Sequence, residues 1–151
     1  MTEAEVRSLF ERLEDVHVVV GSVDLGHPEA AVGDTFCTYT PDDGTEPDKM
    51  PFATIVTKNV PGWDETSDLD RAGAFRVNLN VGRAHLPAVD GEVDHTERDR
   101  LLPHPQYATH GWVSIVEPGR STAEDLATLL DIAHDRAAAR HRSRRSHEPP
   151  A

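Results

Sequence analysis

The sequence is poor in cysteine, lysine and aromatic residues. Cys37 is the only cysteine among 151 residues, which excludes an intramolecular disulfide and a cysteine-based zinc site. Aromatic residues make up 5% of the chain, so the core must consist mainly of Val, Leu, Ile and Ala. No apolar run approaches the roughly 18 residues of a membrane-spanning helix, and the N-terminal segment lacks the continuous apolar stretch of a signal peptide. We therefore expect a soluble, cytoplasmic protein without a membrane partner.

Acidic residues are abundant and unevenly distributed. The formal net charge is −12, with a pI near 5.0. Through Asp135 there are 10 basic and 26 acidic residues, a charge of −16, whereas from Arg136 onward five Arg stand against one Glu, a charge of +4. Nucleic-acid binding depends on clustered Lys and Arg that displace counterions from phosphates. The acidic body therefore argues against nucleic acid as a partner.

The length fits one domain, and the apolar periodicity changes along the chain. Thr2 and Glu5 form a capping box before a helix expected over residues 3–14. Ser121 and Glu124 predict a second capping box at the start of a helix that runs to about residue 140. Between the helices, β-branched or alternating segments predict strands at residues 16–20, 34–40, 52–58, 74–81 and 112–116.

This order of elements predicts the α+β class. We expect a single compact domain over residues 1–140, with an antiparallel sheet of about four or five strands and the N- and C-terminal helices packed on one face. Residues 141–151, rich in Arg, Ser and Pro, have little to bury and are expected to form a disordered tail.

The clearest strand carries the first group of candidate binding residues. In residues 74–81, Arg76 and Asn78 alternate with apolar residues and so share one face of the sheet. Arg83 follows just after Gly82, where a short helix could begin, and Lys58 ends a neighbouring strand. Guanidinium groups beside free helix amides bind carboxylates and phosphates. The alternatives are a solvent-facing surface whose arginines pair with nearby acids, and a protein interface.

The stretch Leu101–Val116 carries the second group, His104, Tyr107 and His110. Together with neighbouring acids these side chains could ligate zinc or nickel, but the two His are six residues apart and no His-x-x-x-His spacing occurs. We therefore expect no metal and no cofactor. In the alternative, His104 and Tyr107 hydrogen-bond the backbone of their own loop. Cys37 lies within an alternating strand, where a buried, inert thiol is the common case.

Several short motifs follow one another along the chain: Asp34-Thr35-Phe36 with Tyr39, Pro51 to Lys58, Leu69-Asp70-Arg71, Phe75 to Asn78, Val81-Gly82-Arg83, Leu102 to Pro105 and Gly111-Trp112-Val113. In this order they resemble an uncharacterised bacterial family, domain-of-unknown-function family 6194, over roughly residues 3–140. More distantly, the strand containing Trp112 and the helix after it are similar to MmcQ/YjbR-like proteins, which implies a compact α+β fold sometimes compared to a double-wing DNA-binding arrangement. Neither resemblance implies an activity.

Three functions remain open from the sequence. The first is a non-catalytic binding module for a small anionic ligand or a protein partner, acting through the residues around Arg76. The second is a small enzyme that uses His104, Tyr107 or His110 beside the same face, although no nucleophile elbow or phosphate loop is present. The third is a nucleic-acid binder that uses the Arg-rich C-terminus. Both a monomer and a homodimer are compatible with the sequence.

Overall fold

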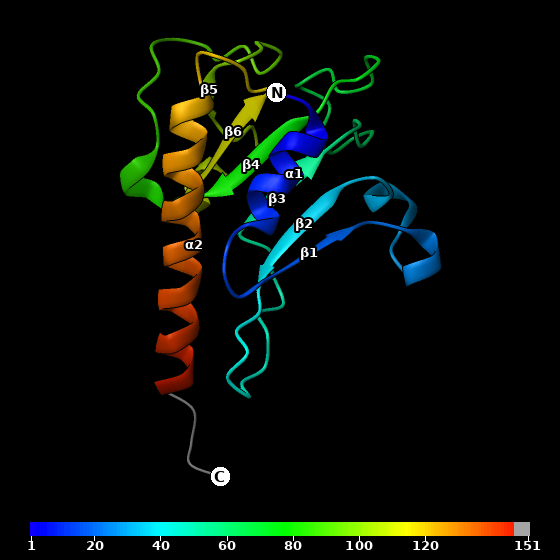
Figure 1. The fold of residues 1–151 in the computed structure, drawn as a ribbon. Helices are drawn as coiled ribbons and strands as arrows, with labels where there is room; N and C mark the ends of the chain where they lie inside the picture. Colours follow the sequence, from blue (N-terminus) through cyan, green and yellow to red (C-terminus); the bar gives the residue numbers. More distant parts are fainter. Residues whose placement is uncertain (147–151) are drawn as a thin grey trace.

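The computed structural model describes residues 1–146, and for residues 145 and 146 only the backbone. Two α-helices pack against a single sheet (Figure 1). Four short 3-10 turns complete the structure: η1 (Val23–Leu25), η2 (Glu29–Ala31), η3 (Arg83–His85) and η4 (Ala108–His110). The main elements, in chain order, are α1 (Glu3–Glu11), β1 (Val16–Val20), β2 (Thr35–Tyr39), β3 (Ala53–Val56), β4 (Arg76–Asn80), β5 (Leu101–Pro103), β6 (Trp112–Val116) and α2 (Ala123–Ser146).

The strands form one antiparallel sheet in the order β1-β2-β3-β4-β6-β5. β4 lies at the centre, where Asn78 is opposite Thr54 of β3 on one side and Ser114 of β6 on the other. All five residues of β4 are buried. The alternation seen in the sequence therefore separates two buried faces, rather than one buried and one solvated face.

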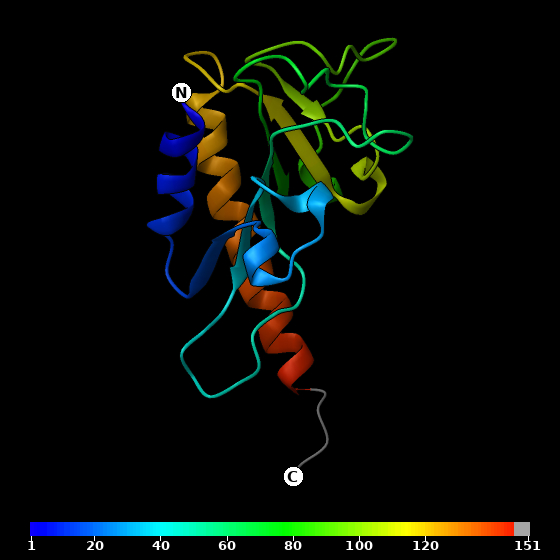
Figure 2. The same ribbon diagram turned by 90° about the vertical axis from the view of Figure 1, so that its right-hand side faces the viewer.

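Both helices cover the same face of the sheet, as predicted. Figure 2 shows α1 and α2 side by side on that face. The hydroxyl of Thr2 accepts a hydrogen bond from the Glu5 amide at 3.1 Å, so the expected N-terminal cap is present. The core between helices and sheet is aliphatic, with few aromatic rings. It includes Val6, Phe10, Cys37, Ile55, Val77, Leu79, Val113, Ile115, Leu126 and Ala133.

Three details of the predicted architecture need correction. The sheet has six strands instead of four or five, because Leu101–Pro103 adds a strand at the edge. Three residues that contain a proline are too short for an alternation pattern to reveal. The helix expected to end near residue 140 continues to Ser146, so the predicted disordered tail begins too early. The last five residues of that tail, 147–151, lie outside the described residues.

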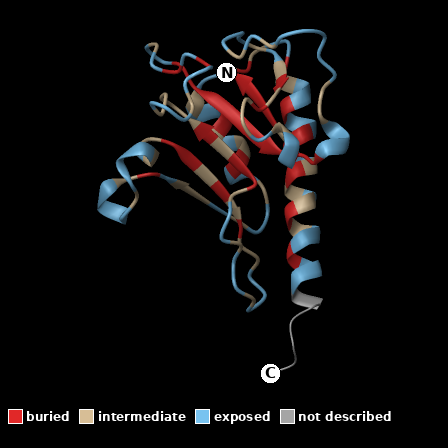
Figure 3. Ribbon diagram, turned by 180° about the vertical axis from the view of Figure 1, so that it is seen from behind, coloured by how far each residue is buried: buried red, intermediate tan, exposed pale blue. Residues whose placement is uncertain are grey.

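The face of the sheet away from the helices is covered by loops. Figure 2 shows the connections after β3 and after β4 crossing this side, and Figure 3 shows that the strands beneath are largely buried. Polar residues of β4 lie under these loops, with Arg76 at 1% and Asn78 at 3% relative exposure. The alternative of a solvent-facing polar surface is therefore wrong in one respect. This face of the sheet is polar, but loops bury it.

Candidate functional site

Arg76 is the centre of a buried hydrogen-bond network. Its guanidinium donates to both carboxylate oxygens of Asp64, at 3.0 and 2.7 Å, and to the Ser67 hydroxyl at 2.9 Å. Its Nε donates to Oδ1 of Asn78 at 2.8 Å. A bidentate contact of this kind is a strong, directional form of ion pair. Arg76 therefore ties the loop after β3 to the sheet, and its charge is neutralised inside the protein.

Asn78 extends this network across three strands. Its Oδ1 accepts from the Ser114 hydroxyl of β6 at 3.0 Å, and its Nδ2 donates to the Thr54 hydroxyl of β3 at 3.0 Å. Each polar group of the Asn78 side chain is thus used within the protein. The Oδ1 atom of Asn80, two residues along the same face, is buried and has no hydrogen-bond partner among the described residues.

His104 lies against Arg76 and is held as a neutral ring. Its Nδ1 accepts hydrogen bonds from the backbone amides of Gln106 and Tyr107, at 3.0 and 3.1 Å, so the ring proton is on Nε2. Burial, followed by the nearby charge of Arg76, lowers the pKa of His104 to about 3. Nε2 lies 3.4 Å from Nη2 of Arg76, and because both atoms carry protons this contact is not a hydrogen bond. The one lone pair of the ring is therefore occupied by loop backbone.

Tyr107 contacts the ring of this buried histidine, and His110 in turn contacts Tyr107. The Tyr107 ring packs on His104 with centroids 4.9 Å apart, whereas His110 is exposed at the end of η4, 6.4 Å from Tyr107. Gln106 donates to the backbone carbonyl of Trp63, whose side chain is exposed. The predicted hydrogen bonding of His104 to its own loop is present, and Tyr107 contributes its backbone amide to it.

The structure does not bring Lys58 and Arg83 together with Arg76. Because β3 and β4 are antiparallel, Lys58 lies beyond the Arg76 end of β4 and Arg83 beyond the opposite end. Lys58 donates to the Val32 carbonyl at 2.5 Å and forms an ion pair with Asp34 at 3.6 Å. The six predicted binding residues therefore form no single pocket. Whether any of them contacts a ligand remains a prediction.

The acids considered as possible metal ligands beside His104 have hydrogen-bond partners within the protein, and the thiol is buried. Asp94 accepts hydrogen bonds from the amide and hydroxyl of Thr96, and Asp99 accepts them around the start of α2. Burial raises the pKa of Cys37 to about 12, so this thiol stays protonated. In the part of the chain that the structure describes, no group of three or more His, Cys, Asp or Glu could hold a metal ion.

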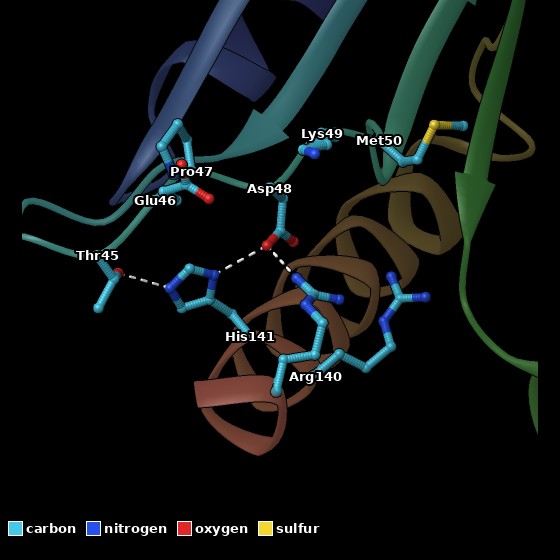
Figure 4. Close-up of a pocket in the computed structure, with 9 residues that line it drawn as sticks. Thr45, Glu46, Pro47, Asp48, Lys49, Met50, Arg140 and His141 are labelled. Atoms are coloured by element: carbon cyan, nitrogen blue, oxygen red, sulfur yellow. Dashed lines mark hydrogen bonds and ion pairs between the residues drawn. The ribbon is translucent and has the colours of Figure 1, made fainter. Parts of the chain in front are cut away.

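A cleft of about 490 Å³ lies elsewhere, between the β2–β3 loop and the last turns of α2. Figure 4 shows the loop residues above the helix, with His141 between Thr45 and Asp48. We call this the α2 cleft; its lining residues are Thr45, Glu46, Pro47, Asp48, Lys49, Met50, Arg140, His141 and Arg144.

Asp48 attaches the loop to α2 at the floor of the α2 cleft. Oδ1 of Asp48 lies 2.8 Å from Nδ1 of His141 and also accepts from Arg144. Nε2 of His141 lies 2.7 Å from the Thr45 hydroxyl. His141 is 7% exposed, which explains why α2 remains ordered beyond the expected domain boundary. This last turn has few apolar side chains to bury, and its contacts with the loop hold it in place instead.

Arg140 also lines the α2 cleft but has no hydrogen-bond or ion-pair partner among residues 1–146. Arg136, Arg140 and Arg144 are spaced by four residues and so follow one side of α2. Desolvation and the like charges of Arg136 and Arg144 lower the pKa of Arg140, and the Asp48 carboxylate partly opposes this shift. Arg136 has no ion pair either, and its Nε atom is buried without a hydrogen-bond partner in the described chain.

The sequence alone does not predict this cleft. The i, i+4, i+8 spacing of Arg136, Arg140 and Arg144 was visible, but basic residues near a helix C-terminus are also expected from the helix dipole. The loop that forms the other side of the cleft could not be predicted, because nothing in the sequence places Asp48 against His141, 93 residues later.

The family of unknown function DUF6194 matches residues 1–146, nearly the whole chain, and the protein belongs to this family. No curated protein and no solved structure gives a significant match. Among the helices in the described chain, none is long and apolar enough to cross a membrane.

Proposed function

We propose that this member of the DUF6194 family is a non-catalytic binding protein for a small anionic ligand, and that the ligand occupies the α2 cleft. The observation that carries the proposal is the Arg140 guanidinium, which borders the cleft and makes no ion pair with any described residue, although the Asp48 carboxylate acts on it from the same cleft. A partly desolvated cation next to two like charges is stabilised when an anion binds between them.

The charge of the α2 cleft contrasts with that of the whole protein. Lys49, Arg140 and Arg144 provide three positive charges against the two of Glu46 and Asp48, in a chain of net charge −12. Like charges four residues apart destabilise a helix. Asp48 already compensates Arg144, so an anion bound at Arg140 would relieve the repulsion that remains. Guanidinium groups bind carboxylates and phosphates through paired hydrogen bonds.

The size of the cleft favours a small molecule over a protein partner. Ligand pockets typically enclose about 300–1,000 Å³, and the α2 cleft, at about 490 Å³, falls within this range. The enzyme hypothesis has less support because the lone pair of His104 is occupied. The nucleic-acid hypothesis has less support because the net charge of the chain is −12. A cytoplasmic location, a bacterial origin and a distant relationship to MmcQ/YjbR-like proteins remain inferences from the sequence.

Thermal unfolding in the presence of multivalent anions tests the proposal. We would compare pyrophosphate and citrate with sodium chloride at equal ionic strength, so that general screening is subtracted. A ligand at 100 times its dissociation constant stabilises a protein by about 2.7 kcal/mol, which corresponds to a rise in Tm of roughly 5–10 °C for a domain of this size. The substitution Arg140→Gln should abolish the rise.

The matched control is Arg120→Gln, which removes an exposed arginine before α2, far along the helix from the cleft. This variant should keep the anion-dependent rise in Tm. The proposal is wrong if no anion stabilises the wild-type protein beyond the salt control, or if both variants respond equally.

A further inference from the structure

We infer that the open edge of β1 is an interface between two copies of this chain, whose β1 strands pair antiparallel and join the two sheets into one. β1 ends the strand order, and among the described residues it has no neighbour on its outer side (Figure 1). A strand in this position presents a row of unpaired amide and carbonyl groups. No residue of β1 lines the α2 cleft, so this interface is separate from the proposed anion site.

The unpaired backbone groups of β1 belong to alternate residues. In an antiparallel ladder, each residue directs its amide and its carbonyl to the same side of the strand, and successive residues alternate between the two sides. Next to the two ends of β1, the carbonyl of Asp15 and the amide of Gly21 form hydrogen bonds on the β2 side. The odd-numbered residues therefore bond to β2. The residues whose backbone groups face the open edge are Val16, Val18 and Val20.

These outward groups are self-complementary about Val18. When a second copy approaches antiparallel, with the two Val18 residues opposite each other, Val16 of each copy lies opposite Val20 of the other. Each of the three residue pairs exchanges two hydrogen bonds, so every outward amide and carbonyl of both strands gains a partner. A contact in which one patch meets itself across a two-fold axis is the commonest kind in homo-oligomers. The backbone of β1 thus favours a second copy of the same strand.

β1 also lacks the features that usually prevent an edge strand from pairing. Edge strands are commonly protected by Lys or Pro, or by being very short. The opposite edge of this sheet is protected in this way, since β5 has three residues and includes Pro103, whereas β1 reads Val-His-Val-Val-Val. Val20 is 38% exposed, and exposed apolar side chains continue on η1, where Val23 is 66% and Leu25 64% exposed. Apolar side chains gathered beside an open edge indicate a protein interface.

The charges that flank β1 fit a second copy of the chain. β1 contains no acidic residue, and the two-fold register places Glu14 and Asp15 opposite the uncharged residues 21 and 22 of the partner, which avoids opposing like charges. The same symmetry brings the end of α1, with Arg12, alongside η1 of the partner, with Asp24. Both side chains are exposed, and neither forms an ion pair within residues 1–146. Opposite charges therefore meet at both ends of the paired strands.

Sedimentation velocity of the full chain tests this interface. We expect a reversible equilibrium between a monomer of 16.6 kDa and a dimer of twice that mass, followed over a roughly hundredfold range of concentration up to about 500 μM. Val20→Lys puts a positive charge on the open edge and should raise the dissociation constant of the dimer at least about tenfold. The matched control is Val89→Lys, the same change at an exposed valine between β4 and β5, which should dimerise like the wild type.

Val18→Pro provides a second test, because it removes an amide that faces outward and leaves the hydrogen bonds to β2 in place. It should also give monomers, and the Tm of each variant shows that it is folded. A wild-type protein that stays monomeric throughout the range would overturn the inference. A dimer that withstands both Val20→Lys and Val18→Pro would also overturn it, because the contact would then lie elsewhere. Neither result changes the anion response expected at Arg140, so the interface and the proposed function fail independently.

Discussion

At the scale of single residues, burial changes what a polar side chain can do. Arg76 has the residue type and the strand position expected of a ligand-binding group, yet its hydrogen bonds to Asp64, Ser67 and Asn78 occupy it internally. Arg140 has the residue type expected of a helix end, yet it borders a cleft without a partner in the described structure. The difference is whether a nearby acid forms an ion pair with the guanidinium, and this depends on loops distant in sequence.

The Arg76–Asp64 pair makes a prediction about stability. Asp64→Asn should destabilise the protein by about 3–5 kcal/mol, because it leaves the guanidinium of Arg76, 1% exposed, without a counter-charge. Urea unfolding of purified protein measures this loss. The control is Glu97→Gln, which breaks the exposed Arg100–Glu97 pair and should cost less than about 1 kcal/mol. Similar losses for the two variants would show that Arg76 is not held as described.

At the scale of elements, the N-terminus of α2 is capped from outside its own sequence. Asp99 accepts hydrogen bonds from the amides of Gly119, Ser121 and Thr122, at 2.8, 3.0 and 3.1 Å, and from the Thr122 hydroxyl at 2.6 Å. The predicted capping box of Ser121 and Glu124 is replaced by this carboxylate, since α2 begins only at Ala123. Asp99 adopts φ 52°, a left-handed conformation that aspartate tolerates better than most residues.

The cap makes stability depend on pH. Its hydrogen bonds, first among them that from Thr122, lower the pKa of Asp99 from 3.8 to about 2. A carboxyl group with a lowered pKa in the folded state stabilises the protein above its unfolded pKa, and this contribution is lost as the pH falls from about 4 to 2. Asp99→Asn should therefore lower stability at pH 7 by about 1–2 kcal/mol and lose less between pH 4 and 2 than the wild type.

Thermal unfolding of both proteins between pH 2 and 7 measures this dependence. Asp131→Asn, on an exposed position of α2, is the control for removal of one negative charge. Parallel pH profiles for the wild type and Asp99→Asn would contradict the assignment of the cap.

At the scale of the whole molecule, the charge is divided between an acidic body and a basic helix end. The body through Asp135 carries −16, whereas the arginine-rich end of α2 borders the acidic loop at Asp48. This division predicts that solubility has a minimum near the pI of 5.0. As the pH falls toward the pI, protonation of side chains brings the negative net charge toward zero. Precipitation by polyethylene glycol from pH 4 to 8 measures the minimum, and solubility that is unchanged across pH 5 would contradict it.

The sequence by itself was sufficient for the α+β class, the antiparallel sheet and the common face of the two helices. Local patterns carry this information: the cap at Thr2, the alternation around Val77 and Leu79, and the apolar spacing of Leu126 and Ala133. Such patterns reflect which side of an element meets the core, and this is set within each segment.

Only the tertiary structure decided the partners of the charged and polar side chains. The strand Leu101–Pro103 forms because β6 offers a free edge. The last turn of α2 is ordered because Asp48 contacts His141. Arg76 is not available to a ligand because it is paired with Asp64. Hydrogen bonds and ion pairs act over a few ångströms. The residues that they join are not spaced by the helical or strand repeat, so no sequence pattern reveals them. Such contacts follow from how the loops close, and that is determined by the folded chain as a whole.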